Sequence, residues 1–263
     1  MVSSSSGYRE AEAIRLNDDE LDRVVSAPGF VLPPQPEQDE PPPPGPPLTL
    51  EEVFGSGKFN VAFFGTPSTR GRWMLQFGGH HLAINVTFAG ATVSNTPYFM
   101  GVEPLTLTFR GQRYAPLSDA ARALFGAVRA LDRRQLAAAK LSTTFDDVLL
   151  GPGTDDAFPA RRGVLVSSLS ASQRRRVTRA IRAWVGDVDS SASKVIVRRY
   201  VSQFSRTRLS WATSTDSATT GAYARLHGPR LWLEIVTQAG LVIPGPHYHS
   251  MHRDTVSDYG ETR

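Results

Sequence analysis

The sequence predicts an α+β fold in which an antiparallel sheet of meander strands is combined with a central helical segment. Three observations lead to this prediction. Runs with strand-like alternation occur early and late in the chain, the segment between them has helical periodicity, and neighbouring predicted strands are separated by short turns. A chain of 263 residues is also long enough to bury a substantial core.

The N-terminal region is expected to lie outside the main domain. Residues 8–26 carry Leu, Ile and Val at helical spacing among charged residues, which predicts a helix. The stretch 31–47 is dense in proline, so it can form neither helix nor sheet interior and is predicted to be an extended linker. We therefore divide the chain into residues 1–47, a helix with a proline-rich linker, and residues 48–263, a single α+β domain.

Three strands are predicted at the start of this domain. Residues 59–66 form the first, residues 72–77 the second and residues 80–88 the third, and the intervening STRG suits a hairpin turn. The chain then turns through FAGAT into TVSNTPYFMG.

The middle of the chain is predicted to be helical. Residues 118–132 have Ser118 as the expected N-cap, and residues 133–141 continue the pattern. A loop at 151–156 precedes a third helix over 170–185, where Ser170 and Gln173 have capping-box spacing. Strand character is then predicted for three further segments: residues 194–204, 207–214 and 222–236.

The composition of the chain excludes several kinds of functional site. The chain has no cysteine, which excludes disulfides, cysteine-bound zinc, iron–sulfur clusters and cysteine nucleophiles. The N-terminus has no apolar segment typical of a secretory signal, and no apolar run reaches the ~20 residues of a membrane span. We expect a soluble, cytoplasmic protein without a membrane partner.

Arginines cluster at positions 174–182, but they carry no nucleic-acid-binding motif and no interleaved aromatic residues. This pattern favours a solvated helix face, and no nucleic-acid partner is expected. No nucleophile elbow, phosphate-binding loop or HExxH motif is present either.

Histidines are grouped in a way that indicates a site. Five of the six lie in two short segments, GGHH and HYHSMH. His247 and His249 are two residues apart, so on a strand both point to one face, which is the spacing that a chelating pair requires. His80 and His81 are adjacent and point to opposite faces of a regular strand. His81 shares the polar face and is the better ligand, unless a bulge at the glycines redirects His80.

A carboxylate and an Arg-Asp pair extend this hypothesis. Glu234 lies in the apolar run LWLEIV, where a carboxylate needs a partner, and it is predicted to orient a ligating histidine or to act as a base. Arg253 and Asp254 follow the histidine pair closely. Arg253 could hold a substrate carboxylate, and Asp254 or Asp258 could take the role proposed for Glu234.

Segments around these residues resemble a known family. QFGGHHLAINVTF, TPYFMG and PHYHSMHRDTVSDYG are similar to hallmark segments of the domain-of-unknown-function 3500 family, in the same order, from about Phe54 to the C-terminus. The proline-rich stretch before Leu48 is where the chain departs from the pattern. The resemblance implies no activity, but it implies that the following residues occupy motif positions: His80, His81, His247, His249, Arg253, Asp254 and Asp258.

The sequence thus favours a metal-dependent enzyme acting on a small molecule or a peptide. The metal would be a divalent transition ion held by imidazoles, with oxidative chemistry at copper or iron placed slightly ahead of hydrolysis at zinc, because a cysteine-free, His-rich site suits a redox metal. The alternative is a non-catalytic binding protein in which the histidines form a structural metal site or a polar network.

Overall fold

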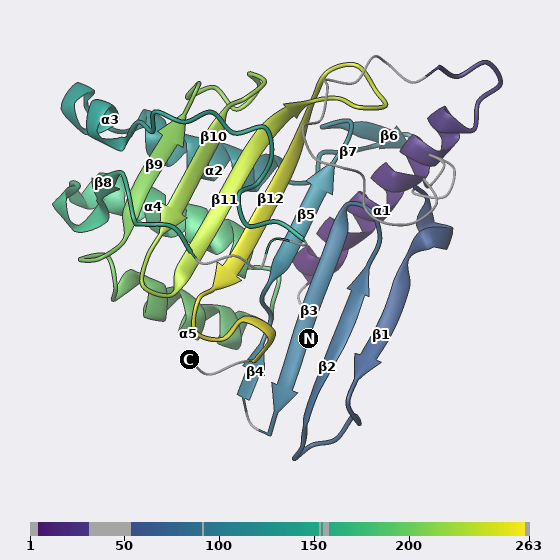
Figure 1. The fold of residues 1–263 in the computed structure, drawn as a ribbon, viewed down its shortest axis with the longest axis horizontal. Helices are drawn as coiled ribbons and strands as arrows, with labels where there is room; N and C mark the ends of the chain where they lie inside the picture. The colour runs from purple at the N-terminus through teal and green to yellow at the C-terminus, as the bar shows by residue number, and fades with distance from the viewer. Residues whose placement is uncertain (1–4, 32–53, 91, 153, 155–157, 261–263) are drawn as a thin grey trace.

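A computed structural model describes residues 5–31, 54–90, 92–152, 154 and 158–260, with only the backbone described for residues 5–8. It has the predicted α+β architecture, with helices and an antiparallel sheet (Figure 1). The predicted proline-rich linker lies, apart from Val31, outside the described residues. No described helix is long and apolar enough to cross a membrane.

A ten-stranded antiparallel sheet forms the centre of the described chain, in the order β1-β2-β3-β5-β12-β11-β10-β9-β8, with β4 paired to β3. Each half of this order follows the chain from strand to neighbouring strand, with two α-helices inserted between β8 and β9, and the two halves join where β5 pairs with β12. A separate hairpin consists of β6 and β7. The strands are β1 (Asn60–Phe64), β2 (Arg72–Gly78), β3 (Leu82–Ala89), β4 (Thr92–Ser94), β5 (Tyr98–Val102), β6 (Leu107–Phe109), β7 (Gln112–Tyr114), β8 (Val164–Leu165), β9 (Arg208–Ala212), β10 (Tyr223–His227), β11 (Leu231–Ala239) and β12 (Pro246–Asp254).

Within the described ranges, five α-helices accompany the sheet: α1 (Ser5–Val25), α2 (Ser118–Arg129), α3 (Arg133–Ala139), α4 (Ala171–Val185) and α5 (Ser190–Val201). The predicted capping box of α4 is confirmed, because the Ser170 side chain accepts the Gln173 N–H and the Gln173 side chain accepts the Ser170 N–H. The prediction that Ser118 caps α2 is wrong. Leu117 occupies that position with φ 60° and no side-chain cap, and its own N–H donates to Glu10 of α1.

The prediction of a strand over 194–204 is also wrong, since this segment lies largely in α5. The β-branched run KVIVRRYV suggested a strand. Its buried residues, Val197, Tyr200 and Phe204, instead follow helical spacing, and Asp189 caps the helix by accepting the N–H groups of Ser191 and Ala192. Burial of one helical face therefore overrides the local propensity.

The two faces of the sheet are covered differently. On one, here called the helix face, Trp184 of α4 donates to Ser250 of β12 and the Tyr200 hydroxyl of α5 lies 3.2 Å from His252 Nε2. Because strand residues alternate, His247, His249 and Met251 point to the opposite face. A segment between α3 and β8 crosses that opposite face, visible in front of the strands in Figure 1, and Val148 packs there with Met251.

Helix α1 is in contact with the rest of the described structure. Ile14 belongs to the main apolar core, and Leu21 packs in a smaller cluster with Phe54 and Val242. Its polar residues Asn17 and Asp18 are fully buried. The division of the chain at residue 48 stays a prediction, but the helix before it contributes directly to the region described next.

Candidate metal centre

Three imidazoles from two distant segments meet on the sheet face opposite the helices. His247 and His249 lie on β12, and their Nε2 atoms are 3.3 Å apart. His81 lies just before β3 and completes a group whose ligand atoms are all within 4.8 Å of one another. The sequence spacing correctly indicated that the two β12 histidines share a face.

Gly101 of β5 makes this meeting possible. It pairs with His249 in the sheet, and its N–H donates to the His81 carbonyl oxygen at 2.7 Å. Gly101 thus lies between the two histidines on the same face. A Cβ at this position would lie 2.4 Å from His81 Cδ2 and 3.0 Å from His249 Cδ2. The two rings therefore occupy the space that a side chain at position 101 would need.

Each of the three rings is oriented by an acceptor at Nδ1. His81 Nδ1 lies 2.9 Å from Asp18 Oδ1, and His249 Nδ1 lies 2.8 Å from Asp147 Oδ1. His247 Nδ1 lies 2.9 Å from the carbonyl oxygen of Ala239. A carbonyl or an ionised carboxylate can only accept, so each Nδ1 carries the proton. In the neutral rings, each Nε2 then presents a lone pair.

If both rings carry their proton on Nδ1 alone, two lone pairs face each other at 3.3 Å, and a proton or a metal ion between the two nitrogens removes their repulsion. Two imidazole ligands of one tetrahedral zinc ion, with bonds of about 2.0–2.1 Å, would have nitrogens about 3.3–3.4 Å apart. The observed Nε2–Nε2 distance between His247 and His249 has this value. His81, within 4.8 Å, would need to move by at most about 1.4 Å to join the same sphere. The arrangement fits a bound transition metal.

Burial keeps these rings in the form that a metal needs. It lowers the pKa of His247 to about 3, with the nearby His249 and His81 adding to the effect. It also lowers the pKa of His81 well below its usual value. Desolvation penalises the imidazolium form in both cases, so both rings are neutral at physiological pH. Metal ligation requires neutral imidazole.

Asp147 is held beside His249 by Glu234 on β11. The fully buried Glu234 carboxylate accepts the N–H groups of Leu149 and Leu150, both at 2.9 Å, and it also accepts from Tyr223 and Trp232. Leu149 is only two residues from Asp147. Glu234 thus fixes the loop that carries the acceptor of His249. Its four hydrogen bonds explain how a carboxylate is tolerated in this apolar strand.

Glu103 is a further buried carboxylate beside the group. Its Oε2 lies 3.8 Å from His247 Nδ1, and its Oε1 accepts the N–H groups of Val242 and Ile243. Asn17 of α1 accepts the Glu103 N–H. Burial raises the pKa of this carboxyl group. Glu103 therefore ties α1 and the β11–β12 turn to the wall of the centre.

His80 is placed next to the three-histidine group but is not a member of it. Its ring lies 4.4 Å from that of His81 and packs edge-on against Phe54. His80 is exposed, whereas His81 is buried. His249 retains 14% side-chain exposure and Asp147 retains 57%. The centre therefore faces solvent past His80, His249 and Asp147.

Arg253 and Asp254 lie four and five residues beyond His249 on β12, which places them roughly 13–17 Å away along the strand. Arg253 Nε donates to Asp258 at 2.7 Å, and Asp258 also accepts the Asp254 N–H. Arg230 pairs with Asp254 at 2.9 Å. These residues build the C-terminal turn, and their predicted catalytic role stays a prediction.

Three residues that sequence analysis missed complete the centre: Asp18, Gly101 and Asp147. Asp18 is 63 positions from His81 and Asp147 is 102 positions from His249, so no local pattern links them. Gly101 lies inside β5, and a glycine within a strand is a signal for the close approach of another group. The sequence did not indicate that His81 and His249 are the residues that approach it.

The model of a family described as "Protein of unknown function (DUF3500)" matches residues 1–261. The match extends the resemblance from Phe54 back through α1, so the helix that carries Asp18 falls within it. No curated protein and no solved structure matches the chain.

Proposed function

This chain belongs to the DUF3500 family, and we propose that it is a metal-dependent enzyme whose centre is held by His81, His247 and His249. The substrate would be a small molecule or a peptide that reaches the centre from the solvent side marked by His80 and Asp147. The proposal rests mainly on the Nδ1 atoms of the three histidines. All three have acceptors, which leaves each Nε2 available to a metal, and one ligand nitrogen of each histidine lies within 4.8 Å of the others.

The donor set bears on which metal would bind. Three neutral imidazoles suit zinc or copper, whereas non-haem iron oxygenases use two histidines and a carboxylate. Asp18 and Asp147 are both engaged with Nδ1 atoms and are not free to ligate. The 3.3 Å spacing between His247 and His249 favours tetrahedral zinc over the copper or iron chemistry that composition suggested.

Three protein ligands suit catalysis better than a purely structural role. Structural zinc sites have four protein ligands, and catalytic ones keep a position open. Among the described residues, the group consists of three histidines. At such an open position, a bound zinc ion acts as a Lewis acid and lowers the pKa of coordinated water.

The chain's own groups would support such chemistry in separate ways. Asp18 and Asp147 hold the rings in one tautomer and raise their basicity as ligands. Asp147 is half-exposed and His80 is exposed, so both border the centre on its solvent side, where desolvation lowers the pKa of His80 to about 3 and keeps its ring neutral. Hydrolysis of an ester or amide is the reaction class that this arrangement suits best.

The proposal is tested by measuring metal and activity together. Protein purified without a histidine tag should contain close to one equivalent of zinc by elemental analysis. It should also hydrolyse a chromogenic ester such as 4-nitrophenyl acetate in a chelator-sensitive way. His249→Ala should lose both the metal and the activity. His227→Ala is the matched control and should retain both, because His227 packs between Phe158 and Trp232 outside the group.

The non-catalytic alternative makes a different prediction. If the protein binds only a structural metal, the unaltered chain would contain zinc but show no chelator-sensitive turnover. The His249→Ala variant would then have a lower folding stability. A polar histidine network would contain no metal at all, and that result would overturn the proposal.

A further inference from the structure

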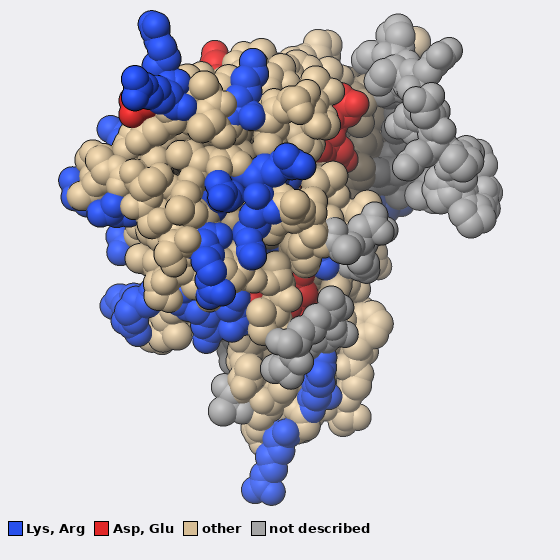
Figure 2. All heavy atoms as spheres, turned by 60° about the vertical axis from the view of Figure 1, so that its left-hand side comes forward, with Lys and Arg blue, Asp and Glu red and all other residues tan. Residues whose placement is uncertain are grey.

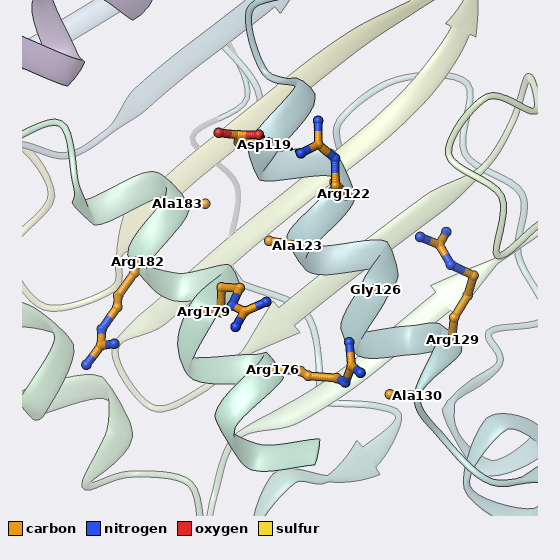
Figure 3. A pocket seen from close by; sticks show the side chains of 10 residues that line it. All are labelled: Asp119, Arg122, Ala123, Gly126, Arg129, Ala130, Arg176, Arg179, Arg182 and Ala183. Carbon is orange, nitrogen blue, oxygen red and sulfur yellow. Dashed lines mark ion pairs between the residues drawn. The ribbon is translucent and has the colours of Figure 1, made fainter. Parts of the chain in front are cut away.

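A concave site lies between α2 and α4, in the helix layer on the other side of the sheet from the metal centre. It is a groove with a volume of about 740 Å³, a size that suits a small-molecule ligand. Figure 3 shows that its walls are the outward faces of the two helices. The proposed metal chemistry makes no use of this groove.

The groove is lined by five arginines and one acidic residue. Arg122 and Arg129 come from α2, and Arg176, Arg179 and Arg182 come from α4. Figure 3 shows Arg176 and Arg179 extending from α4 toward α2. Figure 2 shows lysine and arginine side chains gathered over one side of the molecule with few acidic ones among them.

Few of these positive charges are neutralised within the protein. Arg122 pairs with Asp119 at 3.1 Å, but both side chains are largely exposed. Among the residues described by the structure, no ion pair is formed by Arg176, Arg179 or Arg182. The three lie at i, i+3 and i+6 on α4, where like charges repel one another. An anion in the groove would relieve this repulsion.

The floor of the groove is made of small residues. Ala123 and Gly126 of α2 face Ala183 of α4, so no large side chain fills the space beneath the arginines. A Cβ built on Gly126 would meet no atom within 4 Å. Arg176 and Arg179 therefore extend over an open hollow into which a ligand could enter, whereas Arg182 extends away from α2 at its edge (Figure 3).

We propose that this groove binds a small ligand carrying two or more phosphate groups. The planar guanidinium group binds phosphate oxygens in a bidentate way, and several such groups around one hollow can hold linked phosphates at once. A single-stranded nucleic acid is a poorer match, because the described lining contains no aromatic residue on which a base could stack.

The test uses inorganic pyrophosphate as the probe and calorimetry on the full chain. Arg176→Gln and Arg179→Gln should each weaken pyrophosphate binding by about tenfold or more, since each removes a charge-assisted contact. Arg175→Gln is the matched control, because Arg175 is an exposed arginine of the same helix that does not line the groove. This variant should bind pyrophosphate with an affinity within about twofold of that of the unaltered chain.

Two further measurements distinguish binding in the groove from binding at the metal centre and from nucleic-acid binding. Pyrophosphate also chelates metals, so the His249→Ala variant is titrated in parallel and should bind pyrophosphate as the unaltered chain does. An unstructured oligonucleotide is compared with pyrophosphate at the same salt concentration. The proposal is overturned if pyrophosphate does not bind, if Arg175→Gln weakens it as much as Arg179→Gln, if His249→Ala abolishes it, or if only the oligonucleotide binds.

Discussion

Replacing Gly101 by alanine would place a methyl group between the imidazoles of His81 and His249. The new Cβ would lie 2.4 Å and 3.0 Å from their Cδ2 atoms. Ordinary carbon–carbon contacts are about 3.5–4.0 Å, so the His81 ring would have to move by roughly 1 Å. The backbone of Gly101 cannot yield easily, because it is paired with both β12 and the His81 carbonyl group.

The consequence for metal binding is larger than the consequence for folding. Metal–ligand distances vary by only about 0.2 Å, and a methyl group between the two rings would keep His81 from making the movement of up to about 1.4 Å that it needs to join the common coordination sphere. Loss of an orienting partner alone costs about 10–100-fold in metal affinity, so loss of a ligand should cost more than about 100-fold. Overpacking should lower the free energy of unfolding by only about 1–3 kcal/mol, which leaves the chain folded.

Both quantities can be measured on one preparation. Zinc affinity is obtained by competition with a chromophoric chelator, and stability by urea unfolding of the metal-free protein. Gly126→Ala is the control, because a Cβ there meets nothing within 4 Å and the site lies in α2. It should leave zinc affinity unchanged and raise stability by about 0.5–1 kcal/mol. Gly101→Ala binding zinc as tightly as the unaltered chain would refute the reasoning.

Two further substitutions test the surroundings of the centre, and a third tests a buried carboxyl group between α4 and α5. Asp18→Asn removes the carboxylate that orients His81 and should weaken zinc binding by about 10–100-fold in a chelator competition, with little loss of helical circular dichroism. Glu234→Gln replaces one carboxylate oxygen by an amide NH2 group, which then faces two of the four buried donors, and should lower the free energy of unfolding by roughly 2–3 kcal/mol; an unchanged urea midpoint would contradict this. Burial and the neighbouring Glu10 raise the pKa of Asp187 to about 7. A raised carboxyl pKa gives stability that is complete below the unfolded pKa of about 3.9 and is lost as pH rises through about 7. Asp187→Asn should therefore flatten the fall in stability between pH 4 and about 7, as followed by thermal melts across that range.

Local patterns in the sequence were enough for much of the fold. The capping box at Ser170 placed the start of α4, and the alternation in HYHS placed His247 and His249 on one face of a strand. Both signals are carried by residues within a few positions of one another. The strand prediction for residues 194–204 was wrong because it followed the strand propensity of β-branched residues. In the fold, the buried residues of this segment lie on one face of a helix.

The centre was predicted only in part, for a related reason. The histidines could be grouped by type and spacing, but Asp18, Gly101 and Asp147 act through contacts that the sheet and α1 create. Glu234 was singled out because a carboxylate in an apolar strand needs partners. Two of those partners are the side chains of Tyr223 and Trp232, and the other two are backbone N–H groups of a loop more than 80 residues away, which no side-chain pattern records.

The junction of β5 with β12 bears on when a metal can be acquired. His81 belongs to the half of the sheet made early in the chain, and His247 and His249 belong to its last strand. During synthesis, the first half leaves the ribosome while β12 does not yet exist. The three-histidine group can therefore form only after β12 has been released. On the proposed function, metal binding would follow the pairing of β12 with β5, and a chain truncated before β12 would keep His81 and Asp18 without binding the ion.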